Sequence, residues 1–573
     1  MKLIRYVFKI LADYKYYLFG QLVCVVLAAT DLAFRPYLLK LIIDFTAGVR
    51  NTFFHDKMFV ITIFSILQLS VFIIWRIFFW CNLSYEAMLK NSLTKNLLKK
   101  VLVYRYDFFE KKSPGIIASH IKDIATITPL IINIILGFIR TFWLLLLSSV
   151  ILWFLNPVFT ILLITWVVIY ISIPIITRYE FRSASTRTTK NYSEIYNSVL
   201  DSIKNILPVQ TFFGYEIELN KLKKEQNKYL FASKAKKNIL LKIYLLQGFI
   251  VVIYQLLCLI FLFHFHEQSL ITIGDFTLVL ITNITLMINI WQTSDDIRLI
   301  YEHYSNVLYS LSELEIDGSN FIIDKSNKDV VGTEIIINEV KFSYDQVQTL
   351  SIPYLKINVG QKIGIVGHSG SGKSTFAKLL MRLHHVNSGE ILIGDNKIDE
   401  IDNHALRDAI SFVPQEISIF NGTISENISY GCINASENDI IKAAKKAQIH
   451  NVIKKLSKEY DTVIGENGIQ ISTGEKQRLA IARVILKNPQ ILIFDEHTSH
   501  QDSIYEFMLK EEFNKALKNK TILIIAHRLS ALEKMDRILV FDSGKIIQDG
   551  PHELLLKEDG MYKKLWDQQI LKY

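Results

Sequence analysis

Long apolar runs alternate with polar stretches through the first half of the chain. Six such runs lie near 17–43, 58–80, 130–153, 158–177, 243–263 and 276–293. A helix needs about 20 apolar residues to cross a bilayer, so each run predicts one membrane span. We expect a transmembrane domain over 1–314, opened by a helix on the membrane surface, then a mostly polar linker over 315–332 and an α/β domain over 333–573.

Basic residues set the orientation of these spans. The stretches that join spans two and three, and spans four and five, are rich in Lys and Arg, whereas the other connections hold few. The positive-inside rule therefore places both termini, the two long stretches and the α/β domain in the cytoplasm. Apolar residues keep helical spacing through both stretches, so we expect the helices to extend past the bilayer and to turn near 108–115 and 207–215, in contact with the α/β domain.

Composition agrees with a membrane protein. Of the 573 residues, 50% are hydrophobic and only 21% are charged, which excludes a purely soluble protein. A net charge of +9 is also found in proteins that bind nucleic acid, but a protein of that class would not carry six spans. We therefore expect membrane lipids, and no nucleic acid, as partners.

The α/β region contains one motif with a well-defined chemistry. It reads Gly367-His368-Ser369-Gly370-Ser371-Gly372-Lys373-Ser374-Thr375 and stands between an apolar run and a helical pattern. This is a P-loop in a strand, loop and helix context, where backbone N–H groups surround phosphate oxygens. Lys373 is expected to reach the β- and γ-phosphates and the Ser374 hydroxyl to complete a Mg²⁺ shell. The motif predicts nucleotide binding.

A second stretch supplies two carboxylates. The apolar residues 491–494 predict a buried strand that delivers Asp495 and Glu496 at its carboxyl end. Asp495 would hold Mg²⁺, directly or through water, and Glu496 would polarise the attacking water. A strand that ends in Asp-Glu is weak evidence alone, but it becomes strong evidence after a P-loop.

Further short segments carry a resemblance to a known family. They are Val340 to Tyr344, Val413-Pro414-Gln415, Ile471 to Arg478, Ser499 to Asp502 and Ala526-His527-Arg528. With the P-loop and the Asp-Glu strand, they stand in the order and spacing of an ATP-binding cassette. Over essentially the whole length the chain resembles half-size ABC exporters, a group that includes bacterial lipid A flippases and multidrug exporters. The resemblance implies a membrane α-helical bundle followed by an α/β P-loop domain, and a transport-coupled ATPase. High usage of Lys, Ile and Asn is typical of an AT-rich genome, and the first residues do not form an Arg- and Ser-rich leader, so we expect a bacterial inner membrane.

The resemblance also implies a role for each matching residue. Tyr344 would stack on adenine, and Gln415 would sense Mg²⁺ and the γ-phosphate. His527 would hold the γ-phosphate and keep Glu496 and the water in line. The signature residues would complete the ATP site of the other subunit; they are Ser472, Thr473, Gly474 and Glu475. Two loop residues, Ser499 and Asp502, would lie at the dimer interface.

The signature departs from the usual Leu-Ser-Gly-Gly-Gln of the family. Thr473 replaces a glycine and adds a branched side chain where backbone approaches phosphate. Glu475 replaces the glutamine and adds a carboxylate that polyphosphate would repel unless it is screened or turned away. Two assemblies follow from this: a homodimer, or a heterodimer with a different half-transporter.

Charges inside the predicted spans bear on the cargo. Asp31 and Arg35 are four residues apart and can pair on one helix. Arg76 and Arg140 resemble the basic residues with which lipid A flippases hold acidic headgroups, which predicts an anionic amphiphile moved outward. The alternatives are arginines that snorkel or pair between helices, a drug exporter, and a regulatory or channel-like protein that moves no cargo itself.

Overall fold

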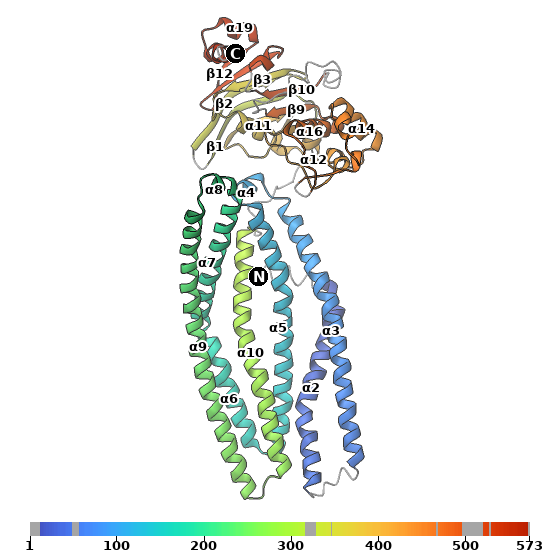
Figure 1. Cartoon of the computed structure of the whole chain (residues 1–573), viewed down its shortest axis with the longest axis vertical. Helices are drawn as coiled ribbons and strands as arrows, with labels where there is room; N and C mark the ends of the chain where they lie inside the picture. The colour runs from blue at the N-terminus through green and yellow to red at the C-terminus, as the bar shows by residue number, and fades with distance from the viewer. Residues whose placement is uncertain are drawn as a thin grey trace. The chain divides into compact units, whose positions relative to one another are not determined.

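The structure is a computed structural model that describes residues 12–47, 57–315, 328–344, 347–465, 468–495, 519–526 and 529–570. The chain forms two compact units (Figure 1). The first, the membrane unit, comprises Met1–Tyr104 and Lys112–Asn320. The second, the cassette unit, comprises Arg105–Lys111 and Phe321–Tyr573, so a short segment from the N-terminal half belongs to it.

Within the described residues, six helices of the membrane unit are long and apolar enough to cross a bilayer, which confirms the prediction of six spans. They are α2 (Lys15–Thr46), α3 (Lys57–Val101), α5 (Pro114–Leu155), α6 (Pro157–Ile176), α9 (Tyr215–Glu267) and α10 (Ile273–Glu313). The amphipathic α7 (Arg178–Lys204) and the short α8 (Ile206–Thr211) complete the unit, after a turn of 3₁₀-helix, η1 (Ala12–Tyr14).

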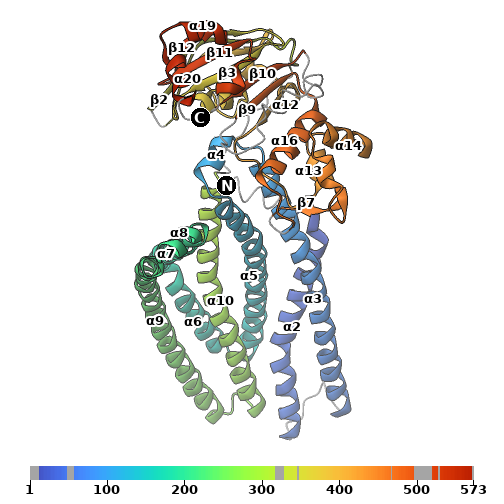
Figure 2. The same cartoon turned by 45° about the horizontal axis from the view of Figure 1, so that its top comes forward.

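Several of these helices are much longer than a bilayer requires. Helix α3 has 45 residues and α9 has 53, so a rise of about 1.5 Å per residue gives lengths of about 70 and 80 Å. The hydrocarbon core of a bilayer is only about 30 Å thick. The two long stretches, between spans two and three and between spans four and five, are therefore largely helical, as the spacing of their apolar residues predicted. In Figures 1 and 2, α2 lies along α3, and α7 lies along α9.

Polar contacts join the ends of α2 and α10. The N-terminus of α10 carries a capping box, in which Thr272 and Asp275 satisfy each other's backbone N–H groups. Lys40 of α2 pairs with Asp275, and Asp44 of α2 accepts a hydrogen bond of 3.0 Å from the Gly274 N–H. A Cβ at Gly274 would overlap the Asp44 carboxylate, so a larger residue here would force that carboxylate to move.

Two sheets form the framework of the cassette unit. An antiparallel sheet has the order β2 (Val347–Ile357), β1 (Ile335–Tyr344), β4 (Ser388–Ile393) and β5 (Asn396–Lys397). The second sheet has the order β12 (Lys545–Gly550), β11 (Arg537–Asp542), β3 (Lys362–Gly367), β10 (Thr521–Ile525), β9 (Ile491–Asp495) and β6 (Ile410–Val413). All strands of the second sheet except β12 are parallel to their neighbours. The predicted α/β domain is therefore confirmed.

Helices cover these sheets and complete the unit. They include α4 (Tyr106–Lys111), α11 (Lys373–Leu380), α13 (Ile424–Ser429), α14 (Glu437–Lys446) and α16 (Thr473–Lys487). The other α-helices among the described residues of this unit are α12 (Asn403–Ala409), α15 (His450–Ile453), α19 (His552–Lys557) and α20 (Met561–Ile570). Every residue of β9 and β10 is buried, as expected for central parallel strands with both faces covered.

Candidate functional site

The P-loop lies between β3 and α11, in the predicted context of strand, loop and helix. Gly367 and Gly372 have φ values of 150° and 101°, which L side chains rarely adopt. A Cβ at Gly367 would overlap the carbonyl oxygen of Phe541 on the neighbouring strand β11. The two glycines therefore allow a turn that other residues would strain.

Lys373 is the first residue of α11 and is buried inside this loop. Its ammonium donates hydrogen bonds of 2.8 Å to the carbonyl oxygens of Gly367 and His368. Burial lowers the pKa of Lys373, while the negative charge of nearby Asp495 acts in the opposite direction. A cation is thus held within the turn that the sequence assigns to phosphates.

A cavity of about 190 Å³ opens at the loop. Its lining includes Ser369, Gly370, Gly372, Lys373, Ser374 and Thr375, together with Thr349 from β2. Pockets for whole drug-sized ligands measure about 300–1,000 Å³, so this cavity has the size of part of a ligand, such as its phosphates. Thr349 is an addition to the predicted set, because the strand that carries it has no motif of its own.

The order of the strands brings the other predicted residues to the same edge. β10 pairs with both β3 and β9, and β6 pairs with β9, all in parallel. The P-loop after β3, Asp495 at the end of β9 and Gln415 two residues after β6 therefore follow the carboxyl ends of one sheet. This is the edge at which open α/β sheets bind their ligands.

Asp495 gives this edge a carboxylate that interacts with the charge of Lys373 and has one oxygen free of hydrogen bonds within the described residues. The residue is only 7% exposed, and within the described part of the chain its Oδ1 atom has no hydrogen-bond partner. A buried ionised carboxylate is costly unless a cation or a hydrogen bond satisfies it. The donor set, this carboxylate with the hydroxyl of Ser374, which follows Lys373 in α11, suits a hard cation such as Mg²⁺.

Tyr344, at the end of β1, is partly buried and lies beside His384. Its hydroxyl is 3.1 Å from His384 Nε2, and Phe342 packs edge-on against its ring at 4.8 Å. Burial raises the pKa of Tyr344, so the phenol stays neutral. The sequence offers no signal for His384, because it follows α11 outside every motif.

Helix α4, which overlaps the predicted turn near 108–115, contacts other residues of the cassette unit through two pairs of charged groups. Asp107 pairs with the buried His384, and Glu110 pairs with Lys378 of α11 at 2.7 Å. Asp107, Glu110 and His384 also have the donor atoms for a metal ion, but Lys378 already supplies a cation to Glu110. The predicted contact at this turn is therefore confirmed, whereas the contact of 207–215 stays a prediction.

The altered signature forms the N-terminus of α16. Ser472 and Glu475 make a capping box, in which the Glu475 carboxylate turns back onto Ser472. The carboxylate is thus committed inside its own helix turn. Four predicted residues lie outside the described part of the chain, and their roles stay predictions; they are Glu496, Ser499, Asp502 and His527.

The membrane unit contains a cavity of about 330 Å³, and Arg140 lines it. The guanidinium donates to Gln292 Oε1 at 3.4 Å, and Asp296 and His303 line the same cavity, beside apolar side chains such as Trp75 and Phe78. Arg76 is exposed and lies over the Phe72 ring at 4.9 Å, and it is not among the lining residues described. Of the two arginines that the sequence assigned to the cargo, only Arg140 is therefore among the lining residues described.

Two further pairs of charged residues lie in the membrane helices. Arg35 pairs with Asp31 on α2, as their spacing predicted. Asp295 pairs with Arg298 one turn along α10, so only the second carboxylate of the Asp295-Asp296 pair lines the cavity. Neighbouring residues of a helix point in different directions, so the depth of a carboxylate in the span does not determine whether it lines the cavity.

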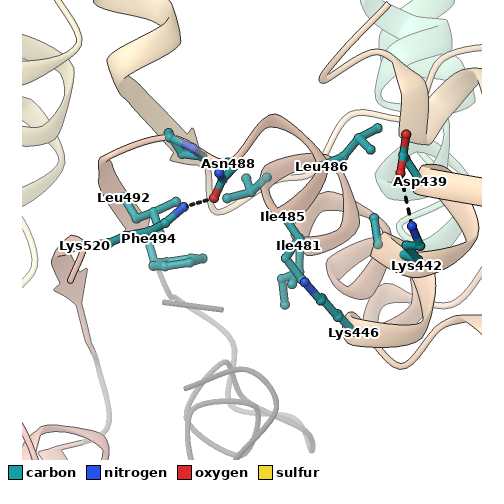
Figure 3. A pocket seen from close by; sticks show the side chains of 13 residues that line it. Asp439, Lys442, Lys446, Ile481, Ile485, Leu486, Asn488, Leu492, Phe494 and Lys520 are labelled. Carbon is teal, nitrogen blue, oxygen red and sulfur yellow. Dashed lines mark hydrogen bonds and ion pairs between the residues drawn. The ribbon is translucent and has the colours of Figure 1, made fainter. Parts of the chain in front are cut away.

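A further cavity, of about 310 Å³, lies in the cassette unit between α14, α16 and β9 (Figure 3). Two of its three basic residues already have partners: Lys442 pairs with Asp439 at 3.7 Å, and Lys520 donates to Asn488. The lining contains no residue of the P-loop and no predicted site residue. We therefore place the candidate site at the P-loop edge.

Comparison with known proteins decides the family. The sequence profile of the ABC transporter transmembrane region matches residues 18–290, and the ABC transporter profile matches residues 350–499. The chain belongs to the ABC transporter family. One membrane region and one ATP-binding domain make this ABC transporter a half-size exporter in architecture, and the ATP-binding domain indicates an ATPase coupled to transport.

Solved and curated relatives agree with this assignment. A bacterial Atm1-family ABC exporter solved with ATP bound superposes on this chain with a TM-score of 0.84 at 25% sequence identity. The match includes 97% of this chain and 99% of that exporter's chain. The mitochondrial iron-sulfur clusters transporter atm1 of Aspergillus fumigatus is 36% identical over 52% of this chain and 42% of its own length. The ATP-dependent lipid A-core flippase of Syntrophus aciditrophicus is 42% identical over 36% of this chain and 35% of its own. The chain thus spans less than half the length of either curated relative.

Proposed function

We propose that this ABC transporter is an ATP-driven exporter that works as a dimer, most simply a homodimer, in a bacterial inner membrane. The observation that carries the proposal is the sheet edge that joins the P-loop, Asp495 and Gln415, on a chain with six spans. Two cassettes would enclose ATP between the P-loop of one and the signature of the other. ATP would favour the closed pair, and hydrolysis would release it.

At the nucleotide, each group would act as its chemistry allows. Tyr344 would offer a flat ring to adenine, and the N–H groups from Gly367 to Thr375 would bind phosphate oxygens. Lys373 would neutralise charge that develops on the β- and γ-phosphates. Glu496 would accept a proton from water while His527 keeps it in line, and Ser499 and Asp502 would lie at the dimer contact.

Magnesium is the cofactor that the donor set suits. Ser374, Gln415 and Asp495 would hold the ion, and the partnerless Oδ1 of Asp495 supports this assignment. When bound, Mg²⁺ supplies positive charge to the phosphate oxygens. The protein residues then orient the nucleotide and exclude water from the buried side of the sheet edge.

For the cargo, we propose an amphiphile with an anionic headgroup. The Arg140 guanidinium lines the membrane cavity together with Gln292, to which it donates, with the polar Asn133 and Asp296, and with apolar side chains. A guanidinium binds carboxylate or phosphate through paired hydrogen bonds, and the apolar wall suits acyl or ring groups. The names of the relatives point to different cargoes, so the cavity is the better guide.

The arginine pair provides a test of this cargo. Arg140→Gln should lower the stimulation of ATPase activity by an acidic lipid at least about five-fold, because it removes the cation that lines the cavity. Arg76→Gln is the matched control and should change the stimulation less than about two-fold, because Arg76 lies outside the described lining. Stimulation is measured in nanodiscs against a neutral lipid of the same chain length.

A larger effect of Arg76→Gln than of Arg140→Gln would contradict the assignment of the cavity. Equal stimulation by acidic and neutral lipids in the unmodified chain would contradict the anionic headgroup. Either result leaves the ATPase proposal standing, because both variants change residues of the membrane unit alone.

The function itself is tested with the purified chain in sealed proteoliposomes. We expect Mg²⁺-dependent ATPase activity and ATP-dependent movement of a fluorescent acidic lipid between leaflets, from particles with the mass of a dimer, and both activities should be lost in Glu496→Gln. ATPase activity without lipid movement would contradict an exporter and support a regulatory or channel-like protein. An inactive monomer that binds ATP would instead indicate a heterodimer with another half-transporter.

A further inference from the structure

Glu475 uses both hydrogen-bond donors of the signature serine. One carboxylate oxygen, Oε2, accepts from the Ser472 backbone N–H at 2.7 Å and from the Ser472 hydroxyl at 2.8 Å. The Ser472 hydroxyl in turn accepts from the Glu475 N–H at 3.4 Å. Ser472 therefore has neither donor left for a ligand while this box is closed.

The charge of Glu475 acts at the same place. Helix α16 has 15 residues, so its N-terminus carries a partial positive charge that attracts anions. The Glu475 carboxylate, in the first turn, neutralises much of that charge. Hydrogen bonds to an ionised acceptor are about twice as strong as those to a neutral one, so a carboxylate is harder to displace than an amide would be.

We infer that Glu475 is an internal competitor for ATP at the signature, and this inference rests on the proposed function. Its carboxylate occupies the hydroxyl, the amide and the helix terminus that the γ-phosphate of the other subunit's ATP would otherwise approach. ATP must displace the carboxylate and also overcome its repulsion. The closed dimer of this chain therefore needs a higher ATP concentration than a chain with an uncharged residue at position 475 would need.

The cassette offers a matched control in a second capping box. At the N-terminus of α13, the Thr423 N–H donates to Glu426 Oε2 at 2.8 Å, and the Glu426 N–H donates to the Thr423 hydroxyl at 3.1 Å. A glutamine can make the same backbone bonds in either box. Glu→Gln at 475 and at 426 is thus the same chemical change at two caps, and only the first belongs to the signature.

The test compares the full-length chain with Glu475→Gln and Glu426→Gln in nanodiscs. We measure ATPase activity against ATP concentration, together with the thermal stability of each chain. Glu475→Gln should lower the ATP concentration for half-maximal hydrolysis about three- to ten-fold. Glu426→Gln should leave it within about two-fold, because its charge lies at another helix. Activity that appears only in Glu475→Gln would also support the inference.

Other results would overturn the inference. If Glu475 is only a helix cap, both variants will lose a similar, small amount of thermal stability and the ATP dependence of Glu475→Gln will not fall. Such a result leaves the proposed function intact, because hydrolysis continues. Absence of hydrolysis from all three chains would overturn the proposed function, and the inference with it.

Discussion

Lys373→Ala should lower the Mg²⁺-ATPase activity of the purified chain about 100- to 1,000-fold, the usual cost of losing a donor that stabilises transition-state charge. The ammonium lies inside the loop, held at 2.8 Å by two carbonyl oxygens that precede it in the chain. ATP would replace those weak partners with charged phosphates. The activity is measured by phosphate release at saturating ATP, and binding is measured with a fluorescent nucleotide.

Lys373→Arg should fail almost as completely, because a planar guanidinium cannot take the place of a compact ammonium inside the loop. Lys362→Ala is the matched control: it removes an ammonium from the opposite end of β3, and we expect activity within about two-fold of the unmodified chain. If Lys373→Ala kept more than a tenth of the activity, the P-loop would not be the hydrolytic site.

The sequence predicted the parts of this molecule that depend on local signals. Long apolar runs gave six helices, and a fixed glycine spacing gave the P-loop, because both properties belong to consecutive residues. The ends of the helices were harder to predict from the sequence. The apolar run at 58–80 became α3, Lys57–Val101, because amphipathic turns extend the helix beyond the membrane-spanning part.

Contacts between residues far apart in the sequence could not be predicted from single segments. Nothing near Asp107 indicates a partner at His384, and nothing in β2 marks Thr349 as a neighbour of the P-loop. Both depend on tertiary packing. Arg76 and Arg140 show the same limit, since position in a span does not define which helix face meets the cavity.

The second large effect is expected at Asp495, where β9 ends. Asp495→Asn keeps the size of the side chain and removes its charge, so the change acts on metal binding more than on packing. We expect ATPase activity to fall about 100-fold or more, because phosphate charge is no longer neutralised by a held cation. ATP should still bind, but its affinity should no longer rise when Mg²⁺ is added.

Thermal stability separates this account from simple damage to the fold. Without Mg²⁺, Asp495→Asn should be about as stable as the unmodified chain, because the lost attraction to Lys373 is offset by removal of a buried carboxylate whose Oδ1 has no hydrogen-bond partner among the described residues. Mg²⁺-ATP at about 100 times its dissociation constant should stabilise the unmodified chain by about 2.7 kcal/mol. Asp495→Asn should lose most of that increment.

Asp542→Asn is the control for Asp495→Asn, because Asp542 also ends a strand of the same sheet, β11. Two strands, β3 and β10, lie between β11 and β9, and Asp542 is partly exposed. It should keep both the activity and the increment from Mg²⁺-ATP. If Asp495→Asn lowered stability without Mg²⁺ and kept its response to Mg²⁺, the carboxylate would be structural. The metal would then be held by other residues of the P-loop edge.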